Sequence, residues 1–161
     1  MARSDHPHVI APPPLIAAAA VAIGLVLDWL LPLDVLRALF SGVLRIVIGL
    51  VLVGAGGALA LIAERAFHAG GTNVMPWKPS IVLVTTGVFS RLRNPMYVGL
   101  GLIVVGIAVA LASDWTLIAL GPAAIVLHRG VVLREERYLE GKFGDAYRRY
   151  KTRVPRYGWP R

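Results

Sequence analysis

Long apolar runs alternate with short polar connections along most of this chain. A helix that crosses a bilayer needs about 20 predominantly apolar residues. The runs predict four such helices, at about residues 14–31, 41–63, 96–112 and 115–133. Only Ser113 and Asp114 separate the last two, which predicts a tight antiparallel hairpin. We therefore predict an all-α fold, a bundle of four transmembrane helices that forms one membrane domain over residues 1–161.

Glycines are frequent inside the second and third predicted helices. They are Gly49, Gly54, Gly56, Gly57, Gly99, Gly101 and Gly106. Small residues let helix backbones approach one another closely in membranes, so we interpret these glycines as helix-packing positions. A nucleotide-binding loop is the weaker interpretation of residues 54–57, because no predicted strand precedes them and the spacing after them does not fit.

The composition agrees with a membrane protein. Hydrophobic residues make up 57% of the chain and charged residues 16%, whereas soluble domains contain about 25% charged residues. The chain has no cysteine. That excludes disulfides, zinc–thiolate sites and iron–sulfur clusters, and we expect no metal site.

The net charge of +8 is unevenly distributed along the chain. Most basic residues lie between the second and third predicted helices or after the fourth, and the opposite side offers only Asp34, Arg37 and Asp114. Because basic residues collect on cytoplasmic loops, we expect a multi-pass protein with both termini in the cytoplasm. The basic residues flank apolar helices instead of forming a separate domain. We therefore expect membrane lipids, and not nucleic acid, as partners.

Two polar segments outside the spans are predicted to lie at the membrane surface. The cytoplasmic loop Glu64–Asn94 is long for a compact protein, and we expect it to line a site, with Trp77 at headgroup depth; a passive linker is the alternative. After the fourth span, apolar side chains recur at helical spacing, which predicts a C-terminal helix. Its stripe is expected to pack on the membrane face or on the loop, and comprises Leu139, Phe143, Tyr147 and Tyr150.

A first polar cluster opens the third predicted helix. Pro95 suits the first helical turn, where free backbone N–H groups and the helix dipole attract an anion such as a carboxylate. Asn94 occupies the N-cap position, and the ring of Tyr97 is able to stack on a purine or lie near a cation. Arg93 is expected to bind a carboxylate or to anchor on lipid phosphate. An ordinary helix start is the alternative interpretation.

A second cluster closes the fourth predicted helix. Glu135 and Glu136 are suited to accept hydrogen bonds from ribose hydroxyls or to hold an ammonium group, and a salt bridge from Glu135 to Arg134 or Arg137 is the alternative. One turn earlier, His128 is a candidate hydrogen-bond donor or base. Its neighbour Arg129 either reaches the interface or orients an anionic substrate group. Both clusters should meet at one membrane face.

The two clusters resemble the isoprenylcysteine carboxyl methyltransferase and phospholipid methyltransferase family of integral membrane enzymes, and most closely its small bacterial-type members. The matching segments are Leu83-Val84-Thr85-Thr86-Gly87, Arg93-Asn94-Pro95-Met96-Tyr97-Val98-Gly99, Glu135-Glu136-Arg137-Tyr138-Leu139, Phe143-Gly144-Asp145-Ala146-Tyr147, Tyr150 and Arg153-Val154-Pro155-Arg156. The resemblance implies a bacterial inner-membrane protein whose cofactor-binding half covers residues 71–156.

The resemblance further implies lipid methylation with S-adenosyl-L-methionine as methyl donor, S-adenosyl-L-homocysteine as product, and a lipid-soluble or isoprenoid-type acceptor. The cofactor-binding residues that it implies are Arg93, Asn94, Pro95, Tyr97, Glu135 and Glu136. Asn94 replaces a histidine of the eukaryotic carboxyl methyltransferases, so a titrating ring is absent there. Val131 replaces the arginine that orients a prenylcysteine carboxylate, which argues against that substrate unless Arg129 substitutes.

Two other functions stay open at this stage. NADPH-dependent membrane reductases of the steroid-reductase type share a similar C-terminal pattern, although they are usually longer. A non-catalytic lipid-binding membrane protein would keep the same fold. The sequence leaves open the methyl acceptor, the choice between O-, N- and S-methylation, and the oligomeric state.

Overall fold

The computed structural model describes residues 6–75 and 78–158. Within these ranges every regular element is helical, which confirms the predicted all-α class. The elements are α1 (Pro13–Leu30), α2 (Val35–Leu39), α3 (Gly42–Ala69), the 3-10 turn η1 (Gly87–Ser90), α4 (Pro95–Leu111), α5 (Asp114–Leu127), the π-helical segment η2 (His128–Val132), α6 (Leu133–Phe143) and α7 (Asp145–Arg153).

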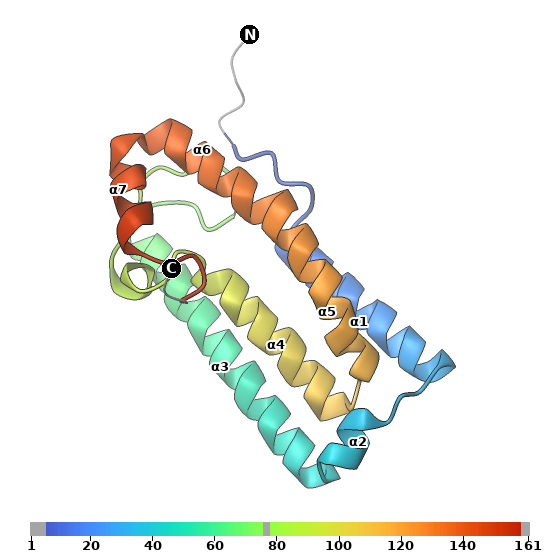
Figure 1. Ribbon diagram of the computed structural model, residues 1–161. Helices are drawn as coiled ribbons and strands as arrows, with labels where there is room; N and C mark the ends of the chain where they lie inside the picture. The colour runs from blue at the N-terminus through green and yellow to red at the C-terminus, as the bar shows by residue number, and fades with distance from the viewer. Residues whose placement is uncertain (1–5, 76–77, 159–161) are drawn as a thin grey trace.

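Helices α1, α3, α4 and α5 form an elongated bundle (Figure 1). The most extensive packing joins α3 to α4 and α1 to α5. Helix α2 and the turn between α4 and α5 lie at one end, called here the α2 end. The turn η1, helix α6 and helix α7 lie at the other, called the α7 end. The chain therefore begins α4 and finishes α5 at the same end of the bundle.

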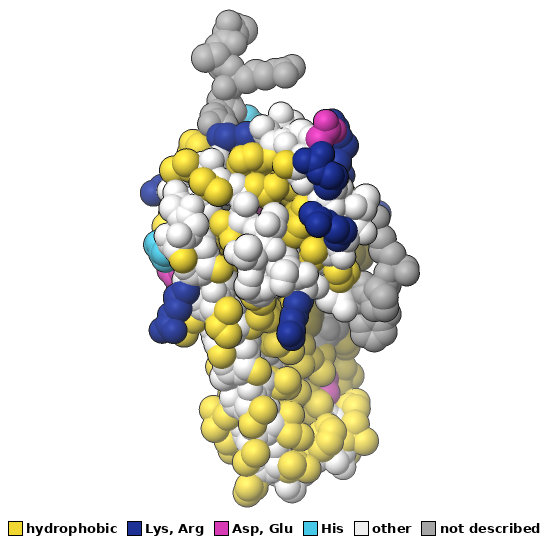
Figure 2. Space-filling view, turned by 90° about the vertical axis from the view of Figure 1, so that its left-hand side faces the viewer, with side chains coloured by type: hydrophobic (Ala, Val, Ile, Leu, Met, Phe, Trp, Pro, Cys, Tyr) yellow, Lys and Arg dark blue, Asp and Glu magenta, His cyan; other side chains and the backbone are white. Residues whose placement is uncertain are grey.

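Three helices of the described chain are long and apolar enough to cross a membrane: α1, α3 and the continuous helix Asp114–Phe143. Helix α4 is also apolar but has only 17 residues. Large apolar side chains face outward, among them Trp29 at 82% exposure. On the face in Figure 2, Lys and Arg gather toward the α7 end and apolar side chains cover the rest. The chain is an integral membrane protein with three to four spans.

Several predicted boundaries differ from the structure. The second predicted span continues as helix to Ala69, so the loop is shorter than predicted. The fourth does not stop at residue 133; it continues as α6 to Phe143. Gly144, at φ 53°, separates α6 from α7. Helix α2 was not predicted. The first two N–H groups of α2, those of Val35 and Leu36, donate hydrogen bonds to the carboxylate of Asp114. Trp77 lies outside the described residues.

The glycines of α3 and α4 fall into two groups. A Cβ atom added to Gly49 would lie 2.6 Å from the carbonyl oxygen of Gly106. The same distance separates a Cβ atom added to Gly99 from the carbonyl oxygen of Gly56. The helix-packing interpretation is confirmed at these four positions. It is wrong at the other three, where an added Cβ atom would meet nothing within 4 Å: Gly54, Gly57 and Gly101.

The predicted aromatic stripe of the C-terminal helices packs on the loop. Tyr147, Tyr150 and Val154 form a buried cluster at the α7 end. Leu83 of the loop packs against this cluster, together with Leu139 and Phe143 of α6. Packing on the membrane face and packing on the loop were the two predicted alternatives. The stripe packs on the loop. Burying these side chains holds α7 over the start of α4.

Candidate functional site

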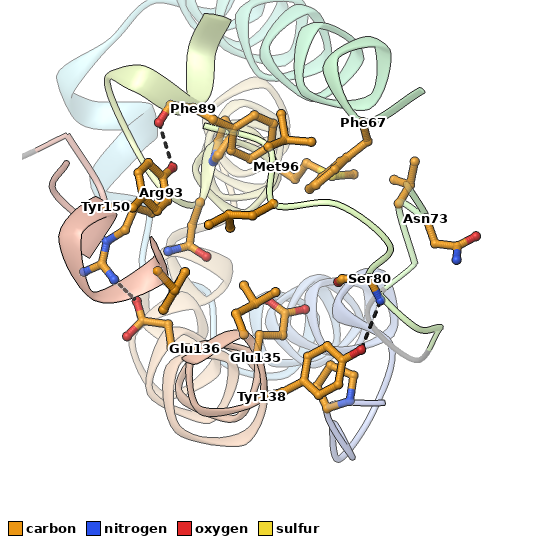
Figure 3. A pocket seen from close by; sticks show the side chains of 18 of the residues that line it. Phe67, Asn73, Ser80, Phe89, Arg93, Met96, Glu135, Glu136, Tyr138 and Tyr150 are labelled. Carbon is orange, nitrogen blue, oxygen red and sulfur yellow. Dashed lines mark hydrogen bonds and ion pairs between the residues drawn. The ribbon is translucent and has the colours of Figure 1, made fainter. Parts of the chain in front are cut away.

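A small cavity of about 100 Å³ lies at the α7 end, between the loop, the start of α4 and the inner face of α6 (Figure 3). We call it the polar pocket. Its walls come from segments far apart in the sequence, and they include Phe67, Ser80, Arg93, Tyr97, Glu135 and Tyr138. All six sequence-predicted cofactor-binding residues line it. The loop, which was expected to line a site, does so.

Tyr97 and Glu135 connect the two polar clusters directly. The Tyr97 hydroxyl donates a hydrogen bond of 2.6 Å to Oε1 of Glu135, across 38 positions of sequence. The expected convergence of the clusters is therefore confirmed. The alternative salt bridge from Glu135 to a neighbouring arginine is wrong: among the described residues, Glu135 bonds to Tyr97 and forms no ion pair with Arg134 or Arg137, which donate to backbone carbonyls. The roles of these residues in binding stay predictions.

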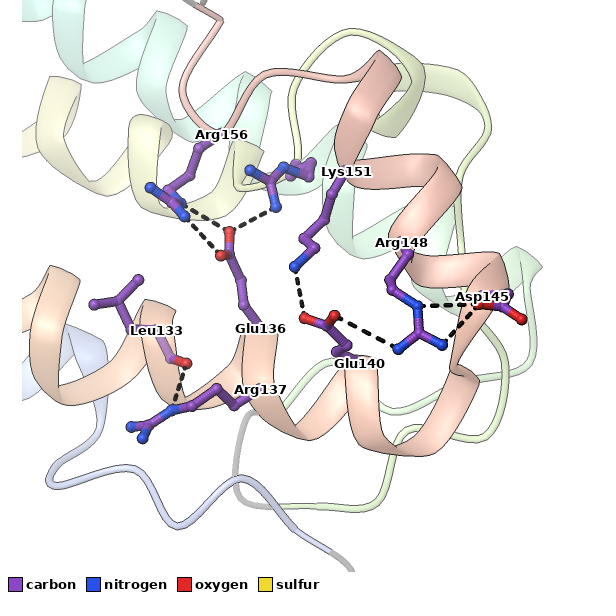
Figure 4. A network of polar contacts seen from close by, with 9 residues as sticks. Leu133, Glu136, Arg137, Glu140, Asp145, Arg148, Lys151 and Arg156 are labelled. Carbon is purple, nitrogen blue, oxygen red and sulfur yellow. Dashed lines mark hydrogen bonds and ion pairs between the residues drawn. The ribbon is translucent and has the colours of Figure 1, made fainter.

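Glu136 lies at the centre of a buried charged network (Figure 4). Nε and Nη2 of Arg156 donate to its two carboxylate oxygens at 2.8 and 2.7 Å, and this hydrogen bond raises the pKa of Arg156. Nη1 of Arg93 forms an ion pair with Oε1 at 2.8 Å, and the Arg93 side chain is 2% exposed. That contact is not a well-aligned hydrogen bond, since Nη1 and Nε of Arg93 both lack a hydrogen-bond partner.

The start of α4 is held by the C-terminal tail. Backbone N–H groups of Arg93 and Asn94 donate to the carbonyl oxygens of Pro155 and Arg156, at 3.0 and 3.2 Å. The Asn94 side-chain amide also donates to Arg156, and it does not cap α4. Asn94 therefore occupies the N-cap position of α4, as predicted, but its side chain makes no capping hydrogen bond. Pro95 is the first residue of α4 and is buried.

Two tyrosines of α7 complete the wall of the polar pocket. Burial raises the pKa of Tyr147 and of Tyr150 above the usual value, and the nearby carboxylate of Glu136 adds to the effect at Tyr147. Both phenols therefore stay protonated near neutral pH. The hydroxyl of Tyr150 donates to the carbonyl oxygen of Phe89 at 2.7 Å, which fixes α7 to η1.

A second cavity, of about 520 Å³, lies between α1, α4 and α5. We call it the apolar cavity, because most of its lining side chains are Ala, Val, Leu and Ile. Its polar side chains gather at the α7 end, where Nδ1 of His128 lies 2.8 Å from the hydroxyl oxygen of Tyr157. Arg129 belongs to the same lining and is exposed. Tyr97 lines both cavities.

His128 and Arg129 therefore lie at the apolar cavity and not at the polar pocket. They belong to the π-helical segment, and such wide turns often occur at functional sites. Sequence reasoning missed Tyr157 and the network role of Arg156. Arg156 ends the matched segment Arg153–Arg156 and Tyr157 follows it, and this position was the available sequence signal. A single aromatic residue in a basic tail, however, does not by itself indicate a site.

Comparison with known proteins gives one family and one relative. The model of the phospholipid methyltransferase family matches residues 44–146, which include α4, α5, α6 and most of α3. An uncharacterised protein of Haemophilus influenzae is 39% identical over 62 residues, which is 38% of this chain and 98% of that protein. No solved structure matches the chain.

Proposed function

The chain belongs to the phospholipid methyltransferase family, and from this premise we propose that it transfers a methyl group from S-adenosyl-L-methionine to a lipid-soluble acceptor. The observation that carries the proposal is the position of Tyr97 between two unlike cavities. The polar pocket suits a charged nucleoside, and the apolar cavity suits a molecule dissolved in the bilayer. A reaction between the two partners requires their sites to be adjacent, as two cavities that share a lining residue are.

The polar pocket contains groups that fit S-adenosyl-L-methionine. Nε of Arg93, which is buried and has no hydrogen-bond partner, is suited to its carboxylate, because a buried donor without an acceptor is costly. Glu135 is suited to its ribose hydroxyls or its ammonium group, and the Tyr97 ring to its sulfonium. The bound donor would supply a methyl group already activated by the positive charge on sulfur. The role that we propose for Glu136 is to position Arg93, since both its oxygens contact arginines.

Binding of the donor requires the loop to move. Pockets for ligands of this size usually measure about 300–1,000 Å³, whereas the polar pocket measures about 100 Å³. In the described part of the loop, the N–H of Ser80 donates to the Tyr138 hydroxyl at 3.1 Å, the N–H groups of Ile81 and Val82 donate to the Thr72 hydroxyl, and the Asn73 amide donates to the carbonyl oxygen of Pro79. We infer that residues 78–84 of the loop shift outward when the donor binds.

The apolar cavity would align the acceptor. Its polar head would lie near Tyr97 and His128, and its apolar part would extend toward the α2 end. Holding both reactants in line supplies about 7–11 kcal/mol of the barrier reduction. A carboxylate acceptor needs no base, whereas for an amine or a hydroxyl acceptor His128 would take the proton. The α7 end, with its basic residues, would face the cytoplasm.

Calorimetric titration with S-adenosyl-L-homocysteine tests the proposal on protein reconstituted in lipid nanodiscs. We expect the wild-type protein to bind the product. Glu135→Gln should lose at least about tenfold in affinity, because a hydrogen bond to a charged group contributes about 1.5–3 kcal/mol. Glu140→Gln is the matched control, since Glu140 lies on α6 and pairs with Lys151 on the outer side. Binding of NADPH instead of the product would favour a reductase and overturn the proposal.

A further inference from the structure

The segment that precedes α1 reaches the polar pocket. We call residues 6–10 the strap; they run beside the continuous helix formed by α5, η2 and α6 (Figure 1). Pro7 is buried and lines the polar pocket, as Tyr138 of α6 does. A proline has no backbone N–H, so it can form such a wall without leaving a donor unsatisfied. The strap lies outside residues 44–146, so the family match assigns no role to it.

Two hydrogen bonds hold the strap on this helix. The N–H of Ile10 donates to the carbonyl oxygen of Gly130 in η2 at 3.2 Å. Nη1 of Arg134, near the start of α6, donates to the carbonyl oxygen of His8 at 2.7 Å. His8 has a φ of 50°, a left-handed conformation that a residue other than glycine keeps only where its surroundings hold it. The strap therefore has a defined docked position beside the pocket.

Gly130 forms a socket for the side chain of Ile10. A Cβ atom added to Gly130 would lie 2.2 Å from Cδ1 and 2.6 Å from Cγ1 of Ile10, and the three atoms nearest to it all belong to Ile10. Ile10 is 51% exposed, so it can move outward without disrupting a core. A side chain at residue 130 would therefore push against the strap. Gly141 of the same continuous helix differs, because an added Cβ atom would meet nothing within 4 Å.

We propose that the strap is a movable wall of the polar pocket, which closes the pocket while Ile10 and His8 are held on the helix and opens it when they are released. That the ligand behind this wall is the methyl donor rests on the function proposed above. The pocket must widen to admit a ligand of that size. The strap has no regular secondary structure, so its release breaks the two attachments without unfolding a helix.

Alkylation of an introduced cysteine measures how readily the pocket opens. The chain has no cysteine, so Met96→Cys places a unique thiol in the wall that α4 contributes. The reagent is a sulfonated maleimide, whose charge keeps it out of the bilayer. The full chain is held in lipid nanodiscs with no cofactor present, and mass spectrometry follows the rate of labelling. Every variant below carries Met96→Cys, and the parent is the protein with that substitution alone.

Two substitutions release the strap at different points. Gly130→Ala pushes Ile10 out of its socket, and Arg134→Met removes the donor that holds His8. Each should raise the alkylation rate about fivefold, because overpacking a close contact or losing a hydrogen bond shifts an opening equilibrium by about that factor. The double variant should be alkylated faster than either single variant.

Each substitution has a matched control on the same continuous helix. Gly141→Ala adds the same methyl group at an open position outside the polar pocket. Arg137→Met removes a guanidinium group that donates to the carbonyl oxygen of Leu133 within α6 and not to the strap. Both controls should be alkylated at the rate of the parent. An unchanged rate in the double variant, or equal acceleration in the controls, would overturn the proposal.

Release of tritiated S-adenosyl-L-homocysteine is the second measurement. Gly130→Ala should release it about fivefold faster than the parent, because the wall opens more often. This variant decides the question if the double variant does not fold. The alkylation assay contains no cofactor, so the two proposals fail separately. Faster alkylation in a protein that binds no S-adenosyl-L-homocysteine would keep the movable wall and refute the methyl donor. Binding with unchanged alkylation and release would do the reverse.

Discussion

Removal of the Glu136 carboxylate should destabilise the fold far more than removal of a neighbouring carboxylate on the same helix. Glu136 is 7% exposed and contacts both Arg93 and Arg156. Breaking a buried ion pair by deleting one partner costs about 3–5 kcal/mol, because it leaves a buried charge without compensation. The Arg156 side chain is 30% exposed, so water can partly hydrate it once Glu136 is removed. This favours the lower end of that energy range. We expect Glu136→Ala to lose about 3 kcal/mol.

The matched control is Glu140→Ala, four residues further along α6. Its side chain is 32% exposed, and it pairs with Lys151 and Arg148 at the surface. An exposed pair of this kind contributes about 0–1 kcal/mol. The difference between Glu136→Ala and Glu140→Ala in lost free energy of unfolding therefore isolates the effect of burial. Figure 4 shows both residues and their partners.

Thermal unfolding in detergent micelles, followed by near-UV circular dichroism, measures both variants. For a chain of this length, 1 kcal/mol shifts the midpoint by about 2–4 °C, so Glu136→Ala should unfold about 6–12 °C below the wild-type protein. Glu140→Ala should shift by less than about 4 °C. Equal shifts in the two variants, or a wild-type midpoint for Glu136→Ala, would refute the structural role of the buried network.

Three further predictions concern other parts of the molecule. Tyr97→Ala removes both the ring that we propose to lie near the sulfonium and the hydroxyl that donates to Glu135, so affinity for S-adenosyl-L-methionine measured by calorimetry should fall by at least about tenfold; an unchanged value contradicts the site. Burial raises the pKa of Tyr147 and Tyr150 in the folded state. Their contribution to the free energy of unfolding is therefore complete below about pH 10, the pKa of a tyrosine in the unfolded chain, and falls as the pH rises above it. Alkaline titration of tyrosinate absorbance should show these phenols ionising only on unfolding, and early ionisation would contradict their burial. Gly99→Val should lose at least about 1–3 kcal/mol in thermal unfolding, because the new Cβ atom meets backbone; a wild-type midpoint would show that α3 and α4 are not in close contact there.

The sequence predicted the meeting of the two polar clusters for a simple geometric reason. Two residues between the third and fourth predicted helices force an antiparallel hairpin, so the start of one helix and the end of the next must share an end of the bundle. Tyr97 and Glu135 follow from that topology. Apolar runs likewise predicted the long helices, because burial in lipid needs continuous hydrophobicity. The charged helix α6 was not joined to α5, since hydrophobicity ends at Leu133 while the helix does not.

The errors at the two polar clusters concern partners distant in sequence. Asn94 has the residue type and position of an N-cap, but its amide contacts the carbonyl oxygen of Arg156, 62 residues away. Glu135 has arginines beside it and bonds instead to a tyrosine on another helix. Gly99 and Gly101 are alike in sequence, and only the neighbouring helix distinguishes packing from cavity. Local patterns contain no information about such contacts, which depend on how the helices assemble.

Transfer of a labelled methyl group tests the central claim most directly. The protein would be reconstituted with S-adenosyl-L-methionine labelled in the methyl group, and with a total membrane lipid extract. We predict label in the organic phase on a lipid product, reduced at least about tenfold in Tyr97→Ala and unchanged in Glu140→Gln. No label in the organic phase, or equal label with the Tyr97 variant, would contradict the claim that donor and acceptor meet at Tyr97.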